Sequence, residues 1–567
     1  MTAAASRPTG KQRLRLPSAR FQRRLVAWAA VLTAMVALTA SGLSRSGSTG
    51  GQPQPIGALP RAQVINFNLV LRLRHGAALD AALAAIENPR SRSFRRFIAP
   101  ARFGQQFGIS VPAMRVLERR LRAAGLDVTG VYPQRTELDV SGTAATVERL
   151  FRVRLERYRD AAGDRYYAPL ASPSLPASLL PSVTDVTGLD TRPMLTPSDV
   201  PEGGLTPALA ATAYDVAALH AAGIDGQGEQ IAVVAFSVFD ADDPAGFAKS
   251  YRLPGPAPKV IPVDGGATDT SVGGEIETNL DLDVIHAIAP DAQILVYEAP
   301  NRPGAYADVI NRIVADRQAT IISSSWGECE PGTALADRLS EEEALRSAVS
   351  AGITMFVAAG DAGAYDCQDE DPADHRLSVD WPAASAYAVA VGGTRLYVAP
   401  DGGYLRETAW NDQLSDSGGG GGFSASEPRP SWQRGPGVIE PDSNGNRQLP
   451  DVSAAADPAT GWATYVNGAP IEVGGTSAAT PFWAASMLLV AQYAKAQGVG
   501  RLGFIDPLLY ALAASRQPYQ PFHVITVGTN RYYHAAHGWN PATGLGSPDV
   551  WNVARDIISY LRGTAPR

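Results

Sequence analysis

The sequence ITMFVAAGD (residues 353–361) and three segments like it, ILVYEAP (294–300), ATIISSSWG (319–327) and AYAVAVGG (386–393), decide the fold. Each holds an apolar run of strand length and ends in a loop of Ser, Gly, Asp or Trp, and helical patterns separate the runs. Strands that alternate with helices predict an α/β fold with a doubly wound, mostly parallel sheet. Ligands and catalytic groups on such sheets gather at the carboxyl ends of the strands.

The whole chain of 567 residues divides into five segments. Basic residues crowd the first 24 positions, and the uncharged run Leu25–Leu43 follows, so residues 1–45 are expected to be a signal peptide or an N-terminal anchor. Export, to an extracellular or membrane-anchored location, is the working prediction. The Ser-, Gly- and Pro-rich stretch 46–62 is expected to be a linker.

Residues 63–190 mix strand-like and helix-like pieces and predict a small α+β domain. VINFNLVLRL alternates with period two, AALDAALAAI is a helix pattern, and residues 94–125 are expected to be one helical stretch that ends at Gly125. Residues 191–204 are expected to be a linker and processing region. The α/β domain then covers 205–567.

The charge is divided unevenly between the two halves of the chain. Residues 1–195 hold 28 Lys and Arg against 12 Asp and Glu, whereas the rest holds 21 basic and 44 acidic residues. The net charge of −7 argues against a nucleic-acid partner. We expect the basic first half to dock on the acidic body of its own chain, and acid to weaken that hold by neutralising carboxylates.

The sharpest local motif is GGTSAATP (474–481), followed by a long apolar helix pattern. Small residues around Ser477 leave its hydroxyl accessible at the positive end of the helix, close to unpaired backbone N–H groups. A helix cap needs less than this, so Ser477 is a candidate nucleophile.

A serine nucleophile needs a base, and the seven histidines supply none in a recognisable setting. Instead, Glu277 and Asp281 are four residues apart in a helix-compatible segment, which places both carboxylates on one face. Like charges so close share a proton, and such a pair suits a base that works in acid. Asp283 is expected to lie off that face, and Glu275 to precede the helix.

Asp361 follows the strand ITMFVA and lies between glycines. Such an Asp is often a turn former. In acid, however, a protonated Asp can donate a hydrogen bond to an oxyanion.

These motifs together resemble the sedolisin family of serine-carboxyl peptidases. The resemblance covers nearly the whole chain after residue 45 and implies a subtilisin-like catalytic domain preceded by an activation domain. It also implies that Ser477 is the nucleophile, Glu277 the base, Asp281 its proton-sharing partner and Asp361 the oxyanion donor. Trp326, Asp380 and Gly421 are expected, less directly, to line the substrate cleft.

The resemblance also implies a calcium site near the C-terminus, built from two carboxylates and several backbone carbonyls. This sequence departs from the family there. Val524 and Asn540 stand where the carboxylates belong. Calcium prefers charged oxygen ligands. We therefore expect no metal or other cofactor, and a C-terminal loop held by packing and hydrogen bonds.

The two cysteines, Cys329 and Cys367, follow two of the predicted strands near the proposed site. In an exported protein a disulfide between them is expected.

The sequence thus predicts a monomeric, exported acid endopeptidase that is made as a self-processing proenzyme, with its own activation domain as inhibitor and proteins or peptides as substrates. Two alternatives stay open: a peptidase of the same family that removes tripeptides from N-termini, and a secreted binding protein on an inactive peptidase fold.

Overall fold

The computed structural model of the protein describes residues 54–159, 165–191, 204–413 and 415–563. The predicted signal or anchor, Leu25–Leu43, and nearly all of the 191–204 linker lie outside these residues. Among the helices that are described, none is both long enough and apolar enough to cross a membrane. The described ends 54–57, 157–159 and 165–166 belong to one compact unit, and all other described residues belong to a second.

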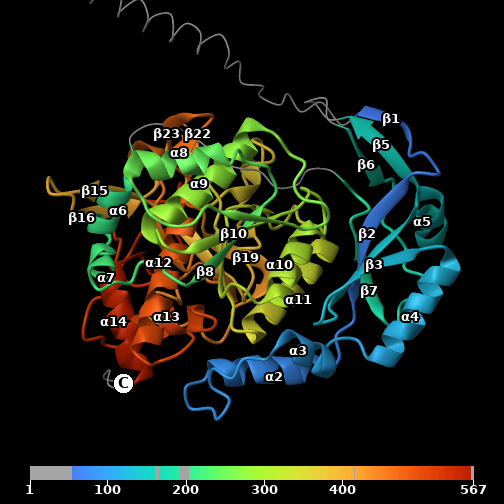
Figure 1. The fold of residues 1–567 in the computed structure, drawn as a ribbon, viewed down its shortest axis with the longest axis horizontal. Helices are drawn as coiled ribbons and strands as arrows, with labels where there is room; N and C mark the ends of the chain where they lie inside the picture. Colours follow the sequence, from blue (N-terminus) through green and yellow to red (C-terminus); the bar gives the residue numbers. More distant parts are fainter. Residues whose placement is uncertain (1–53, 160–164, 192–203, 414, 564–567) are drawn as a thin grey trace, which may run out of the picture. The chain divides into compact units, whose positions relative to one another are not determined.

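The sheet predicted from the four apolar segments is present and mostly parallel, with the strand order β16-β15-β13-β11-β8-β10-β9. Figure 1 labels β8, β10, β15 and β16 of this sheet. Seven strands run parallel to their neighbours, and β16 pairs antiparallel with β15. The eighth strand, β21, pairs with β15 beside this path. The strands are β8 (Gln230–Ala235), β9 (Lys259–Pro262), β10 (Gln293–Glu298), β11 (Ile321–Ser324), β13 (Thr354–Ala358), β15 (Val389–Val398), β16 (Tyr404–Ala409) and β21 (Val452–Ala455).

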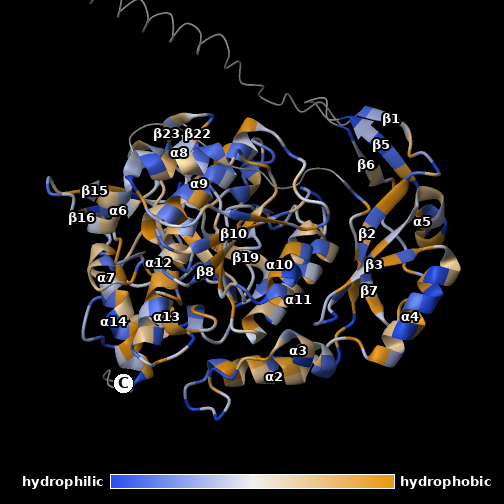
Figure 2. Cartoon of the chain, viewed as in Figure 1, coloured by the Kyte–Doolittle hydropathy of each residue, from blue (hydrophilic) through white to orange (hydrophobic). Residues whose placement is uncertain are grey.

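Helices cover both faces of this sheet, as the continuous apolar runs require. In β8, Ile231 and Val233 face the core shared with helices α9 (Val272–Ile288) and α12 (Thr476–Ala496). The alternate residue Val234 faces the core shared with α10 (Ala305–Asp316) and α11 (Leu335–Ser350). The strands at the centre of the domain are correspondingly hydrophobic (Figure 2). The prediction of an α/β domain with a doubly wound sheet is confirmed.

The N-terminal α+β domain is built on an antiparallel sheet with the order β3-β4-β2-β7. Its strands are β2 (Val64–Leu71), β3 (Asp127–Val131), β4 (Glu137–Thr143) and β7 (Val183–Thr187). Its helices are α2 (Gly76–Glu87), α3 (Pro100–Gln106), α4 (Val111–Ala124) and α5 (Ala144–Phe151).

Two expectations for this region were wrong in detail. The helical stretch is divided into α3 and α4, because Ser110 caps α4 by accepting a hydrogen bond from the Ala113 N–H and Pro112 follows it. Part of the expected 46–62 linker forms the strand β1 (Gln54–Ala58), in a sheet of order β1-β5-β6. Gly125, with a φ of 89°, ends α4 as expected.

The remaining elements lie outside the eight-stranded sheet and the β3-β4-β2-β7 sheet. The helices are α6 (Pro207–Ala213), α7 (Ala217–Ala221), α8 (Asp242–Tyr251), α13 (Asp506–Ala513) and α14 (Val550–Leu561), with short 3₁₀ turns η1 (Asp366–Gln368) and η2 (Pro458–Thr460). The strands are β5 (Leu155–Arg159), β6 (Arg165–Pro169), β12 (Glu328–Cys329), β14 (Asp380–Trp381), β17 (Asn411–Asp412), β18 (Ser417–Gly418), β19 (Gly422–Pro428), β20 (Asn446–Leu449), β22 (Trp462–Val466), β23 (Ala469–Val473), β24 (Phe522–His523) and β25 (Ser547–Pro548).

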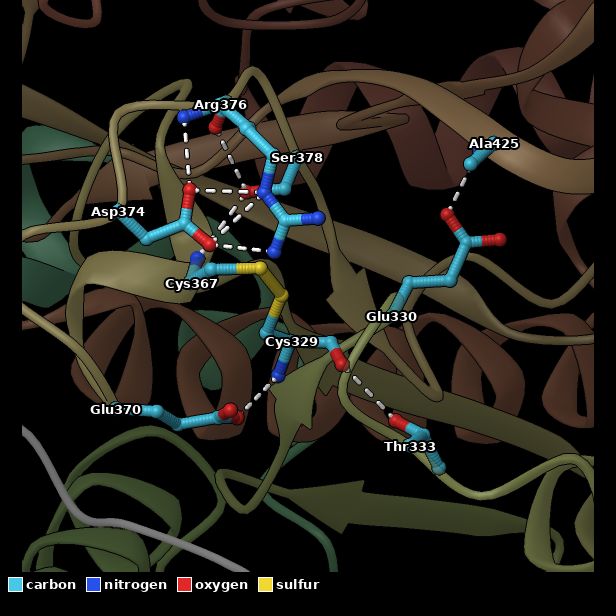
Figure 3. The surroundings of a disulfide bond; sticks show 9 residues. All are labelled: Cys329, Glu330, Thr333, Cys367, Glu370, Asp374, Arg376, Ser378 and Ala425. Carbon is cyan, nitrogen blue, oxygen red and sulfur yellow. Dashed lines mark hydrogen bonds and ion pairs between the residues drawn. A yellow bond between two sulfur atoms is a disulfide. The ribbon is translucent and has the colours of Figure 1, made fainter.

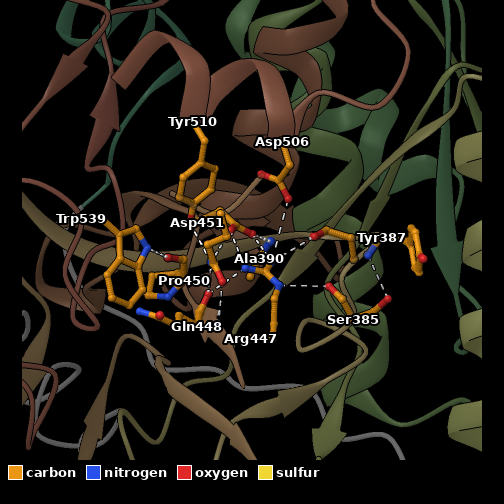
Figure 4. A network of polar contacts seen from close by, with 12 residues as sticks. Ser385, Tyr387, Ala390, Arg447, Gln448, Pro450, Asp451, Asp506, Tyr510 and Trp539 are labelled. Atoms are coloured by element: carbon orange, nitrogen blue, oxygen red, sulfur yellow. Dashed lines mark hydrogen bonds and ion pairs between the residues drawn. The ribbon is translucent and has the colours of Figure 1, made fainter. Parts of the chain in front are cut away.

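A fully buried ion pair joins several of these elements (Figure 4). Arg447 of β20 donates from Nη1 to Asp451 Oδ1 over 2.7 Å, and its Nη2 also contacts Asp506 at 3.9 Å. Asp451 in turn accepts from the Ala390 N–H of β15 and from the Tyr510 hydroxyl of α13. The guanidinium thus has countercharges and hydrogen-bond partners in a region without solvent.

Candidate active site

Ser477 lies in the first turn of α12 and is 3% exposed. The two glycines before it allow the tight approach to this helix: Gly475 has a φ of 114°, and a Cβ at Gly474 would lie 2.5 Å from the Ala456 carbonyl oxygen. The first N–H groups of a helix have no partner within it, and they carry its positive partial charge. The side chain of Ser477 is therefore placed where developing negative charge is stabilised.

Glu277 and Asp281 lie on α9, and both are fully buried. Helix α9 packs directly against α12, the helix of Ser477. Ser271 caps α9 through its hydroxyl, which accepts from the Gly274 N–H. Because α9 begins at Val272, Glu275 lies inside its first turn, contrary to expectation.

Ser325, just after β11, connects the two helices. Its Oγ lies 2.8 Å from Asp281 Oδ1 and 3.1 Å from the carbonyl oxygen of Ser477. Burial raises the pKa of Asp281 to about 8, against the opposing effect of hydrogen bonds from Ser325 and Ser323. Asp281 is therefore protonated throughout the acid range and can share that proton with a neighbouring carboxylate.

Asp361 follows β13 and is held to the same turn of α12. Its Oδ1 accepts hydrogen bonds from the N–H and from the hydroxyl of Thr476, both over 2.7 Å. Its backbone carbonyl accepts from the Gly418 N–H, and the Gly420 N–H donates to the carbonyl of Gly360. The glycine run 418–422 therefore lies along the chain's own backbone and positions Asp361.

A small cavity of about 20 Å³ contains both Ser477 and Asp361 in its wall. Asp380, predicted for the cleft, also lines it. Trp326 lies instead in the core, 1% exposed and packed edge-on against Phe236. Gly421 is buried, and a Cβ on it would lie 2.2 Å from the Pro541 carbonyl oxygen. The backbone that packs against Gly421 is therefore the protein's own and not a substrate's.

Sequence reasoning missed two parts of this site. Ser325 was only one of three adjacent serines in ISSSWGE, and only its position after β11 distinguishes it. The cavity is also lined by carboxylic acids beside the two cysteines, namely Glu328, Asp366, Asp369 and Glu370. The sequences GECE and YDCQDED that surround Cys329 and Cys367 were the available signal.

The predicted disulfide between Cys329 and Cys367 is formed (Figure 3). It joins β12 to the 3₁₀ turn η1, and Glu370 Oε1 accepts from the Cys329 N–H over 2.7 Å. Figure 3 shows Glu370 beside the bridge, on the side opposite Glu330. The bridge therefore fixes one wall of the cavity.

The C-terminal loop lacks both carboxylates that the family's calcium site would require. Val524 is 48% exposed and has no side-chain oxygen. The Asn540 amide donates to the Ala536 carbonyl oxygen over 3.1 Å, and its Oδ1 accepts from the N–H groups of Ala542 and Thr543. Across the described residues, no three His, Cys, Asp or Glu side chains come together as a metal site requires.

Comparison with known proteins agrees with this architecture. The profile of the Pro-kumamolisin activation domain matches residues 54–192, and that of the subtilase family matches residues 266–500. The chain is 35% identical to kumamolisin of Bacillus sp. (strain MN-32), over 88% of this chain and 92% of that protein. It is 29% identical to sedolisin of Pseudomonas sp. (strain 101), over 89% of each.

A solved structure described as Pseudomonas sedolisin, a serine-carboxyl proteinase, in complex with two molecules of pseudo-iodotyrostatin, superposes with a TM-score of 0.55 at 28% identity. It covers 64% of this chain and 99% of its own. Tripeptidyl-peptidase 1 of Mus musculus is 23% identical over 89% of this chain and 93% of that protein. The chain belongs to the sedolisin family of serine-type peptidases, as a kumamolisin-like member with its own activation domain.

Proposed function

We propose that this peptidase is an exported proenzyme that cleaves internal peptide bonds in acid. Ser477 attacks the scissile carbonyl carbon, Glu277 takes the hydroxyl proton and passes it to the leaving amine, and Asp281 shares its proton with Glu277. Asp361, protonated, donates to the oxyanion.

The observation that carries this proposal is the single hydroxyl of Ser325 between Asp281 and the backbone of Ser477. It supports a common site for the carboxylates of α9 and the nucleophile of α12. The hydrogen bonds of Asp361 fit its proposed role as donor to the oxyanion. Its Oδ1 accepts two hydrogen bonds from Thr476, so Oδ2 is the oxygen that would carry the proton.

The activation domain is suited to inhibit the enzyme within the same chain. Asn68 of β2 donates to both carboxylate oxygens of the buried Asp308 over 2.7 Å. Phe97 packs against Gly352 and Gly503, where any Cβ would collide with its ring. Export through residues 1–45 and self-cleavage within 191–204 complete the proposal.

The test is an incubation of purified proenzyme across about pH 3 to about pH 7, with the Ser477→Ala variant as control. We expect chain shortening and cleavage of a denatured protein only in acid and only with Ser477 present. A maximum near neutral pH would exclude Glu277 as the base. An inactive but folded wild type would favour the binding-protein alternative. Cleavage restricted to substrates with a free N-terminus, with three residues released, would show a tripeptidyl peptidase.

A further inference from the structure

The cavity beside Ser477 is lined by an unusual set of acidic side chains. Among the described residues, its walls hold six carboxyl groups, from Glu328, Asp361, Asp366, Asp369, Glu370 and Asp380, and no basic side chain. Only Asp361 among them has a part in the proposed chemistry. The other five need an explanation of their own.

Asp380 points to a missing partner. It is 5% exposed, and its buried Oδ1 has no hydrogen-bond partner within the part of the chain that the structure describes. The carboxyl group lies over Gly327 in the cavity wall: a Cβ at Gly327 would be 2.2 Å from Asp380 Oδ2. A buried carboxyl oxygen without a partner costs free energy that a ligand can recover.

The position of the cavity defines which substrate group would enter it. In the proposed mechanism, Ser477 in its wall attacks the carbon of the scissile carbonyl, and Asp361 donates a hydrogen bond to the oxygen of the same carbonyl. The side chain attached one bond from that carbon therefore begins at the mouth of the cavity. The carboxyl groups of Asp380 and Asp366 occupy the space beside Gly327 and Gly360, so a compact end group that enters the cavity would meet both carboxyl groups.

We propose that this cavity selects a lysine at the residue that supplies the scissile carbonyl, in preference to arginine and to uncharged residues. The inference rests on the proposed peptidase function and adds its specificity. A volume of about 20 Å³ accepts one group the size of a water molecule. An ammonium group is that compact, whereas a guanidinium is a planar fork.

Lowering the pH should weaken the preference for lysine, because protonation removes the negative charge of the carboxylates. Burial and the neighbouring carboxylates raise the pKa of Asp366 and Asp380 well above the usual value, and those of Asp369 and Glu328 to about 7 and about 8. Burial also raises the pKa of Glu370, whereas Arg531 lowers that of Asp369. Two carboxyl groups outside the cavity, Asp337 on α11 and Glu330, add negative charge near Glu328 and Asp366 respectively. A bound ammonium favours the ionised carboxylates, so its binding releases protons.

The experiment compares kcat/KM for blocked peptides that differ only at the residue before the cleaved bond: lysine, arginine, norleucine or glutamate. We expect lysine to exceed norleucine about tenfold or more, and this ratio to increase from about pH 3 to about pH 6. Asp380→Asn should reduce the lysine-to-norleucine ratio about tenfold. The matched control is Asp374→Asn, which removes a carboxylate from the same disulfide-linked segment but outside the cavity and should leave the ratio unchanged.

The other outcomes overturn the proposal. A ratio near one for peptides that are cleaved excludes lysine selection while leaving the peptidase function intact. A higher rate for arginine than for lysine excludes the size argument. A lysine preference that calcium suppresses and a chelator restores would assign the carboxylates to a metal ion. If none of the peptides is cleaved, and a denatured protein is not cleaved either, the proposed function itself fails.

Discussion

At the scale of single residues, the proposed role of Asp361 as a hydrogen-bond donor predicts a dependence of activity on pH. Thr476 donates to Oδ1 of this carboxyl from both its N–H and its hydroxyl. A carboxylic acid donates only while it is protonated, whereas an amide in the same place donates at every pH.

Asp361→Asn should therefore remain active at higher pH than the wild type, relative to its own maximum. Asp361→Ala removes the donor and should lower kcat about 10²- to 10³-fold. Both are measured as pH–kcat profiles on one blocked peptide, with melting temperatures to verify folding. An Asn variant whose profile matches the wild type would show that Asp361 does not set the upper limit of the pH range.

The residues of the site could be predicted to different extents. Gly-Gly-Thr-Ser-Ala and the four-residue spacing of Glu277 and Asp281 are local patterns, so the sequence was enough to single them out as candidates. The part played by Ser325 depends on a contact between β11, α9 and α12, which no spacing within one segment encodes. Trp326 was expected at the cleft from the resemblance to the family, but its side chain lies in the core.

At the scale of elements, the buried Arg447 holds β20, β15 and α13 together through Asp451 and Asp506 (Figure 4). The apolar runs predicted the strands, but they did not predict this pair. An Arg and an Asp four positions apart are common on exposed surfaces, and only the assembled fold removes their solvent.

Arg447→Met should reduce the free energy of unfolding by about 3–5 kcal/mol, because it leaves Asp451 and Asp506 buried without a countercharge. The loss should be smaller in acid, since burial raises the pKa of Asp506 well above its usual value and protonation removes its charge. Urea unfolding of the Ser477→Ala proenzyme background measures both. Arg434→Met, at an exposed position, is the control and should change stability by less than about 0.5 kcal/mol.

The loop around Asn540 should be stable without metal. A chelator should leave the melting temperature of the proenzyme unchanged. Asn540→Ala should lower stability by about 1–3 kcal/mol, because the N–H groups of Ala542 and Thr543 lose their acceptor in a buried region. A decrease of many degrees on addition of chelator would show that calcium is bound after all.

At the scale of the whole molecule, the contacts between activation domain and peptidase domain include both exposed and buried carboxyl groups. Arg346 pairs with Asp80, which is largely exposed. Glu137, by contrast, is buried and accepts from Asn311 and Ser340. Burial, aided by Asp139, raises its pKa to about 8.

The sign for Glu137 follows from linkage. A carboxyl whose folded pKa is raised stabilises the docked state fully below its ordinary pKa, and that contribution is lost as pH rises through about 8. Acid therefore strengthens this contact, whereas the charge distribution alone suggested that acid loosens the domain everywhere. The sequence shows the opposite net charges of the two halves, but it does not show which carboxylates become buried between them.

Glu137→Gln should behave as the permanently protonated form. In the Ser477→Ala background, the melting temperature of the wild-type proenzyme should fall from about pH 5 to about pH 9 more steeply than that of the variant. Asp80→Asn is the comparison, because it removes the charge of the exposed pair with Arg346 and leaves Glu137 in place. Equal slopes for Glu137→Gln and the wild type would assign the pH dependence to other groups.

The packing of α12 also has a consequence for biosynthesis. Ser477 begins a helix that contacts α9, made much earlier, and α14, made later in the chain. A ribosome thus delivers the activation domain first, the carboxylates of α9 next, and Ser477 and its last supporting helix near the end. If Ser477 is the nucleophile, as proposed, a truncated translation product that ends before Ser477 contains the activation domain but cannot cleave peptide bonds.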